Sequence, residues 1–195
     1  MNTLTLDDFA RAAAALSIPV RRIQAICRVE APNGGFDSNG NLRMLFEGHQ
    51  FSKFTDHRYD DTHPTISARD WKTARQFYSK GMTPDIRNAG ENRRLQEAIT
   101  LDRTAALKSA SYGKFQLMGF NFAACGFPDV EAMYEAMQKG EGPQLDAFVN
   151  FVKQDRGGAL LRAAQAGNAQ GFAQLYNGDG YKDNAYDAKL LKEGF

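Results

Sequence analysis

The sequence has few residues of the kinds that mark specialised protein classes. Only 2 of its 195 residues are cysteine and only 1 is tryptophan. Cys27 and Cys125 lie far apart and lack the close spacing of a cysteine pair that binds a metal. A chain of this size does not depend on one disulfide, so we expect two free, buried thiols.

Strong net charge and long apolar runs are also missing. The formal net charge is +1 at pH 7, which gives no field that would favour nucleic acid. Arg21, Arg22 and Arg28 share an early helix, where a solvated face is a simpler explanation than an anion-binding patch. No apolar run approaches the roughly 18 residues of a membrane span, and the first eight residues do not resemble a signal peptide. We therefore expect a cytoplasmic monomer without stable membrane insertion, which needs another factor to reach any substrate outside the cytoplasm.

The remaining composition is that of an ordinary globular protein. With 43% hydrophobic and 24% charged residues, the chain can form one domain over residues 1–195 with a sizeable core. We find no repeat, linker or low-complexity segment. The pattern predicts a mainly helical fold with a long polar loop at 52–70. After the first two helices, further helices are expected at about 69–80, 91–109, 114–124, 129–138, 143–154, 158–166, 169–176 and 184–193, with ends uncertain by roughly 2–4 residues.

Glu30 is the most informative single residue. A second helix begins near Pro19, and Val20, Ile23, Cys27 and Glu30 form one stripe along it. A carboxyl group on an apolar stripe is costly unless it is paired or protonated. An ion-paired structural glutamate and a catalytic acid both satisfy this pattern. The glycines that follow would open space in front of the side chain.

Glu47 is a second candidate carboxylate. Residues 42–47 alternate partly between apolar and polar, and they predict a short strand or a β-hairpin around 42–54. An exposed strand position would explain Glu47 equally well. Its interest is that glycoside hydrolysis commonly uses two carboxylates at a defined separation.

Two glycine-containing turns carry amide and aromatic side chains that suit sugar rings. In the first, Gly113 permits close backbone approach and Gln116 offers both a donor and an acceptor. The second turn contains Tyr176, Asn177 and Gly178. Taken alone, the first could be an ordinary helix start and the second an ordinary helix end.

Histidines and aspartates in the 49–63 region suggest a metal-dependent peptidase as an alternative. The residues are His49, Asp56, His57, Asp60, Asp61 and His63. They contain no tight ligand spacing such as HExxH, so a solvated loop is the better explanation and no cofactor is expected.

Taken together, these segments resemble the N-acetylmuramidase domain of phage endolysins, a family with a lysozyme-like fold. The resemblance runs in order from about residue 20 to the end. Tyr112 stands where the family usually has tryptophan, which keeps an aromatic ring. The matching segments are Arg28-Val29-Glu30, Gly35-Phe36-Asp37 with Gly40, Leu45-Phe46-Glu47-Gly48-His49 with Phe51, Ala110-Ser111-Tyr112-Gly113, Phe115-Gln116, Met118-Gly119-Phe120-Asn121, Gly126-Phe127, Tyr176-Asn177-Gly178, Gly180-Tyr181, Tyr186-Asp187 and Lys189-Leu190.

The resemblance implies an all-α, lysozyme-like catalytic domain with a small β element and no separate wall-binding module. It implies cleavage of the β-1,4 bond between N-acetylmuramic acid and N-acetylglucosamine in peptidoglycan. Such an enzyme would wait in the host cytoplasm for a membrane pore. A lytic transglycosylase and a non-catalytic wall-binding or phage structural protein remain alternatives. The resemblance implies Glu30 as the general acid. From the residues themselves we further predict Glu47 as a second catalytic carboxylate. The predicted substrate-binding residues are Tyr112, Phe115, Gln116, Tyr176, Asn177 and Gly178.

Overall fold

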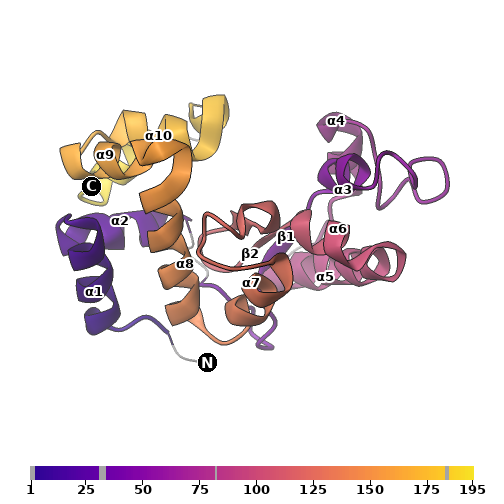
Figure 1. Ribbon diagram of the computed structural model, residues 1–195, viewed down its shortest axis with the longest axis horizontal. Coiled ribbons are helices and arrows are strands. Elements are labelled where there is room, and N and C mark those ends of the chain that lie inside the picture. The colour runs from indigo at the N-terminus through magenta and orange to yellow at the C-terminus, as the bar shows by residue number, and fades with distance from the viewer. Residues whose placement is uncertain (1–2, 31–33, 82, 183–184) are drawn as a thin grey trace.

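Helices make up most of the computed structural model, which describes residues 3–30, 34–81, 83–182 and 185–195 (Figure 1). The expectation of a mainly helical fold with a small β element is confirmed. The α-helices are α1 (Leu6–Leu16), α2 (Val20–Glu30), α3 (Gly48–Phe54), α4 (Trp71–Ala74), α5 (Pro84–Leu101), α6 (Arg103–Lys108), α7 (Val130–Met137), α8 (Glu141–Gln154), α9 (Ala159–Ala166), α10 (Ala169–Asn177) and α11 (Tyr186–Lys192). Single 3₁₀ turns are η1 (Arg75–Phe77), η2 (Gly119–Asn121), η3 (Asp155–Gly157) and η4 (Gly178–Tyr181).

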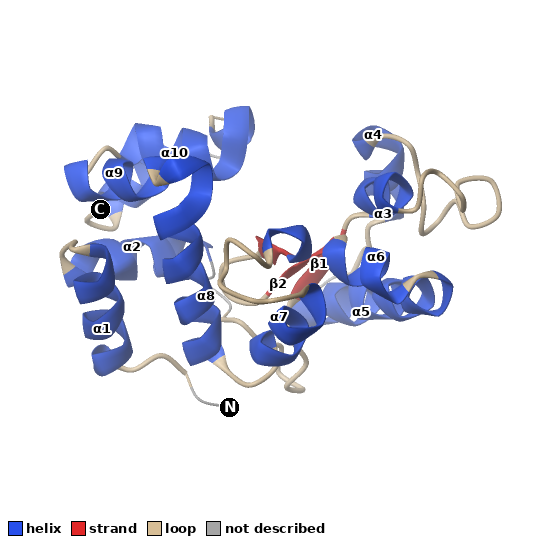
Figure 2. Ribbon diagram, in the orientation of Figure 1, coloured by secondary structure: helices blue, strands red, loops and turns tan. Residues whose placement is uncertain are grey.

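A small antiparallel sheet lies between two groups of helices (Figure 2). Its strands are β1 (Met44–Phe46), β2 (Ala110–Tyr112) and β3 (Leu117–Met118), in the order β1-β2-β3. The short strand expected in this region is present as β1, but the alternative of a β-hairpin over 42–54 is wrong. Residue Leu45 of β1 pairs with Ser111 of β2, far along the chain, and residues 48–54 form α3 instead of a second strand.

The two helix groups come from different parts of the chain. The terminal lobe, which we define as α1, α2 and α8–α11, packs the first two helices against the last ones (Figure 1). The middle lobe contains the sheet and α3–α7. Packing of α7 against α8 connects the lobes, and one continuous set of buried apolar side chains runs through both.

Local sequence explains how the first two helices form. Thr5 and Asp8 make a reciprocal capping box at the start of α1, and Ser17 ends that helix in a left-handed conformation. On α2, Ile23 and Cys27 are buried as the stripe predicts. The opposite face is not simply solvated. Arg22 donates to the carbonyl oxygens of Ala164 and Gln165, and Arg28 pairs with Glu193 at 2.6 Å. These contacts fasten α2 to the C-terminal helices.

The predicted helix over 114–124 is also wrong. Gly113 and Gln116 have φ values of 69° and 46°, in the left-handed region that a helix cannot contain. They form a tight turn between β2 and β3. The helix expected at 91–109 is instead divided at Asp102, whose extended backbone separates α5 from α6 and whose side chain accepts from Ala105 N.

Both cysteines are free and buried. Burial raises the pKa of the Cys27 thiol and of the Cys125 thiol to about 12, so neither is a nucleophile at neutral pH. Across the described part of the chain, no helix is both long enough and apolar enough to cross a bilayer.

Candidate active site

Glu30 is the last residue of α2 and opens onto a pocket of about 150 Å³. Burial raises the pKa of its carboxyl group from 4.5 to about 7, even though hydrogen bonds from Tyr186 and Asn177 act to lower it. Glu30 is therefore protonated in a substantial fraction of molecules at neutral pH. A carboxyl group in this state can donate a proton to a glycosidic oxygen.

The hydroxyl of Tyr186, at the start of α11, donates to Glu30 Oε1. Tyr186 is buried, and burial together with the neighbouring Glu30 raises its own pKa far above the ordinary value of 10. The phenol therefore stays a donor at every pH at which the enzyme would work. Packing of α11 against α2, together with the Arg28–Glu193 pair, holds this donor in place.

The predicted sugar-binding turn at 113–116 forms one wall of the Glu30 pocket. Gln116 is exposed and lines the pocket, while its own amide closes the turn. Its Nε2 donates to Gly113 O at 2.8 Å, and its Oε1 accepts from Ser111 Oγ at 2.9 Å. A left-handed non-glycine residue at the mouth of a pocket is costly in backbone energy and typical of functional positions.

Tyr112 and Phe115 lie behind this turn rather than in the pocket. Tyr112 is fully buried in β2 and its hydroxyl donates to Leu107 O at 2.8 Å. The expectation of direct sugar contact by Tyr112 is therefore corrected, because no part of its ring reaches solvent. Phe115 borders the pocket, but its side chain is 1% exposed and stacks on Phe148 with ring centroids 4.3 Å apart. Both aromatic rings support the turn from below.

The second predicted turn lies across the pocket from the first. Tyr176 and Asn177 line the pocket at the end of α10, and Gly178 follows with a φ of 64°. The Tyr176 hydroxyl donates to Phe115 O at 2.7 Å, so it connects the two turns directly. Asn177 is the exposed residue of this turn, and it lies close enough to Glu30 to hydrogen-bond the carboxyl group. The structure thus brings Glu30, Gln116, Tyr176 and Asn177 together.

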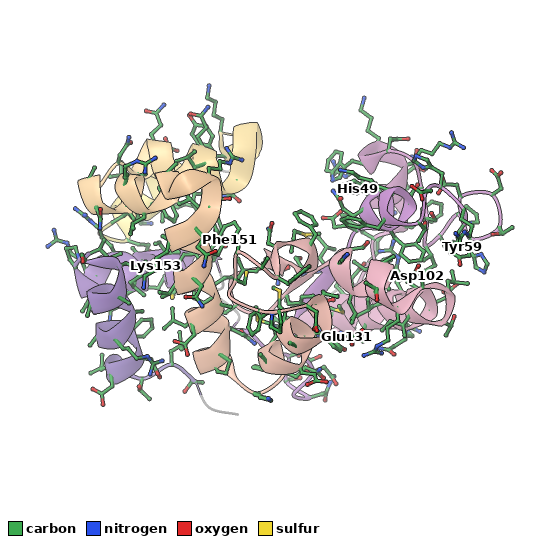
Figure 3. The ribbon with its side chains drawn as sticks, in the orientation of Figure 1. His49, Tyr59, Asp102, Glu131, Phe151 and Lys153 are labelled. Carbon is green, nitrogen blue, oxygen red and sulfur yellow. The ribbon has the colours of Figure 1, made fainter. Side chains whose placement is uncertain are left out.

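A larger hollow of about 420 Å³ adjoins this pocket. Gln116 lines both hollows, and we call the two together the groove. The Glu30 pocket lies between the lobes, whereas the residues of the larger hollow all belong to the middle lobe. In Figure 3, Phe151 on α8 and His49 on α3 lie on opposite sides of the central sheet, and Phe151 lines the Glu30 pocket. The other residues of the larger hollow are Arg43, Met44, Leu45, Tyr78, Ser79, Pro84, Arg87, Asn88 and Glu91.

Glu47 occupies the N-cap position of α3, on the middle lobe, but its side chain makes no capping hydrogen bond. Its side chain is 16% exposed. The Tyr78 hydroxyl donates to Oε2, and His49 Nδ1 lies 3.3 Å from the same oxygen. Glu47 lines neither hollow itself, but Tyr78 does. Tyr78 therefore stands between this carboxylate and the larger hollow.

The histidine-rich segment has a structural explanation. Ser52 Oγ lies 2.8 Å from His57 Nδ1, and Asp60 accepts from Ser67 while contacting Arg69 and His57. These contacts brace the loop after α3. Within the described ranges, no three His, Cys, Asp or Glu residues are grouped to hold a metal ion.

Two buried side chains of α8 support the groove from behind. Gln144 Oε1 accepts from Lys114 N at 2.7 Å, and Glu141 accepts from Gly35 N at 2.8 Å. A Cβ on Gly35 would lie 2.1 Å from Gln144, so a larger residue does not fit there. One helix thus fixes both the turn bearing Gln116 and the chain just beyond Glu30.

The main site residues that the sequence did not reveal are Tyr186, Tyr78 and Gln144. Tyr186 belonged to a matching segment, but nothing in its spacing showed that it would reach Glu30. Tyr78 and Gln144 gave no signal at all, because each acts through a contact with a residue far along the chain.

A carboxyl group with a raised pKa, in a groove walled by amide and aromatic side chains, is the arrangement of a glycoside hydrolase. The family profile described as N-acetylmuramidase matches residues 19–193, and the chain belongs to this family. It is therefore an enzyme that hydrolyses glycosidic bonds of peptidoglycan, as predicted from the sequence. The crystal structure of the Burkholderia AP3 phage endolysin is similar, with a TM-score of 0.85 and 33% identity. The match covers 97% of this chain and 68% of that one. Comparison with curated protein sequences gives no match.

Proposed function

We propose that this N-acetylmuramidase works as an endolysin in which Glu30 is the general acid. The observation that carries the proposal is the Glu30 carboxyl group, which has a pKa of about 7 at the mouth of a pocket. The proton moves from Glu30 to the oxygen of the β-1,4 bond as that bond breaks. Gln116 and Asn177 hold the sugars on either side by hydrogen bonds, and Gly178 leaves space beside Asn177 because nothing lies within 4 Å of its Cβ position.

Glu47 acts as the second carboxylate in this proposal. The contacts from Tyr78 and His49 both fall on Oε2, which leaves Oε1 to accept a proton from the attacking water. An ionised carboxylate on the opposite lobe also stabilises the oxocarbenium-like transition state. Its position behind Tyr78 requires the substrate or a water chain to reach it from the larger hollow.

The experiment is digestion of purified sacculi by the wild-type enzyme, Glu30→Gln and Glu47→Gln, followed by mass spectrometry of the fragments. We expect reducing-end N-acetylmuramic acid from the wild type, and at least about a hundredfold slower release from Glu30→Gln. Anhydro-muramyl ends would show transglycosylation and remove the need for Glu47. If the Glu30→Gln enzyme kept a tenth of wild-type activity, another residue would have to supply the proton.

The wall polymer is the only partner that the proposal requires. The described surface presents no large apolar area, since its exposed large apolar side chains are scattered over α1, α2, α4, α5, η2 and α11. We propose a monomer that meets the wall once the inner membrane has been opened.

A further inference from the structure

The larger hollow carries a charge arrangement that the cleavage reaction does not use. Two arginines line it, Arg43 on the segment leading into β1 and Arg87 in the first turns of α5. Their acidic neighbours are already occupied. Arg43 Nη2 lies 2.8 Å from Asp85, and buried Glu91 pairs with Arg94 at 2.8 Å.

Arg87 is the other arginine of this hollow, and within the described residues its charge is not paired with a carboxylate. Its Nη1 donates to Gly81 O at 2.9 Å, which fixes the guanidinium at the rim of the hollow. Among the residues that the structure describes, no carboxylate forms an ion pair with Arg87. A guanidinium with free N–H groups beside a hollow is a receptor for a carboxylate.

The polar groups deeper in the hollow cannot themselves attract an acid. Asn88 is buried and its amide is committed to Asp37, Leu42 O and Met44 N. Glu91 also accepts from the backbone N–H groups of Phe46 and Ser79, which further satisfies its charge. The deeper residues of the hollow, Asn88 and Glu91, therefore carry no net charge that is left unpaired, whereas Arg87 makes its edge positive.

The two sugars of the substrate differ by one chemical feature that such a rim can recognise. N-acetylmuramic acid carries a lactyl group on O3, which ends in a carboxylate or continues into an acidic peptide. N-acetylglucosamine carries only a hydroxyl there. Gln116 joins this hollow to the Glu30 pocket, so a glycan bound across Glu30 extends a substituted sugar into it.

We infer that the larger hollow is a subsite for the acidic lactyl or lactyl-peptide substituent of the glycan, with Arg87 as its specificity-determining residue. This inference rests on the proposed function. The carboxylate is held by charge-assisted hydrogen bonds from the rim, and the substituted sugar is thereby set in register with the scissile bond.

The test compares the wild type, Arg87→Gln and Arg93→Gln. Arg93 is an exposed arginine on the same helix that does not line the hollow, so its substitution is a matched control for lost charge. Substrates are glycan strands with and without their peptides, each before and after conversion of the carboxylates to primary amides. The quantity measured is the ratio of kcat/KM on the acidic strand to kcat/KM on its amide.

We expect Arg87→Gln to lower this ratio about tenfold or more, and Arg93→Gln to leave it unchanged. A loss confined to peptide-free strands identifies the lactyl carboxylate, and a loss confined to peptide-bearing strands identifies the peptide acids. An unchanged ratio in both strand types, or an equal change in Arg93→Gln, would overturn the inference. Failure of the wild type to cleave any strand would instead refute the proposed function.

Discussion

The acidity of Glu30 is set by two opposing influences. Burial disfavours the carboxylate and raises its pKa, while the hydroxyl of Tyr186 and the amide of Asn177 stabilise the charged form. Burial is the larger influence, so the pKa settles at about 7 rather than near 4.5. The same hydroxyl fixes the direction in which the carboxyl group points.

Substitution of Tyr186 by phenylalanine should therefore change the pH profile. Loss of a hydrogen bond to the charged form raises the pKa of Glu30, so the alkaline limb of kcat/KM should move to higher pH. Maximal kcat should also fall several-fold, because the acid is less well oriented. Tyr181→Phe is the matched control, since buried Tyr181 contacts Gln170 and not Glu30. An unmoved limb, or one that moves to lower pH, would contradict the role given to Tyr186.

Among the individual residues, the sequence predicted the acid Glu30 but not Tyr186, which hydrogen-bonds to it. The apolar stripe was sufficient to predict that Glu30 lies on the buried face of α2, where Ile23 and Cys27 are buried although Val20 is exposed. Tyr186 could not be inferred, because the contact spans 156 positions and no periodicity extends across such a separation. The prediction that Tyr112 contacts sugar failed because an aromatic residue in a motif can be either a binding surface or a core support.

Among the elements, α8 has the widest influence on the groove. Gln144 is 1% exposed and touches both the turn at 113–116 and the chain at Gly35. Both ends of its amide are hydrogen-bonded, with Oε1 accepting from Lys114 N and Nε2 donating to Met137 O at 2.9 Å. The position of Gln116 therefore depends on a residue that never meets the substrate.

Gln144→Ala should lower both stability and turnover. Loss of the amide leaves Lys114 N and Met137 O without their partner, which costs about 1–3 kcal/mol for each buried group left unpaired. The turn then loosens, so kcat/KM should fall by more than the folded fraction does. Denaturant unfolding and steady-state kinetics measure the two effects. Gln138→Ala, on the exposed end of α7, should change the free energy of unfolding by less than about 0.5 kcal/mol. Wild-type kinetics in a destabilised Gln144→Ala enzyme would show that α8 supports only the fold.

Secondary structure was predictable where apolar residues recur on one face of a helix. The predictions were wrong where the chain reverses direction. Helices α7 to α10 appear within a few residues of their expected positions, because their apolar spacing and caps are local. Strand β1 lies where a short strand was expected, but β2 and β3 were missed because they have only two or three residues each and β2 pairs with β1 across a long separation. The turn at Gln116 was taken for a helix because a left-handed glutamine has no sequence signature.

At the scale of the whole molecule, the raised pKa of Glu30 lowers the free energy of unfolding at alkaline pH. In the unfolded chain Glu30 titrates near its ordinary pKa of 4.5, whereas in the folded protein its pKa is about 7. The folded state therefore holds the extra proton between these values, and stability falls as pH rises through them. A shift of this size is worth on the order of 3 kcal/mol at pH 8, with partial exposure of the group reducing it.

Glu30→Gln should accordingly be more stable than the wild type at alkaline pH. The glutamine side chain does not ionise, so the free energy of unfolding of the variant should not fall as pH rises through the pKa of Glu30. We expect the variant to exceed the wild type by little at pH 4.5 and by roughly 1–3 kcal/mol at pH 8. Denaturant titrations at both pH values measure the difference. Parallel pH dependences for the two proteins would mean that Glu30 does not have a raised pKa in the folded state.

The Tyr186–Glu30 contact also has a consequence for how the protein is made. Ribosomes deliver the acid early and its phenol partner 156 residues later. During translation the growing chain can fold α1 and α2, yet the acid remains without its partner until α11 has emerged and packed against them. Messages cut short before codon 186 would therefore yield fragments with an unfinished proton donor. The order of synthesis therefore leaves every incomplete copy of this enzyme without the hydrogen bond that orients its acid.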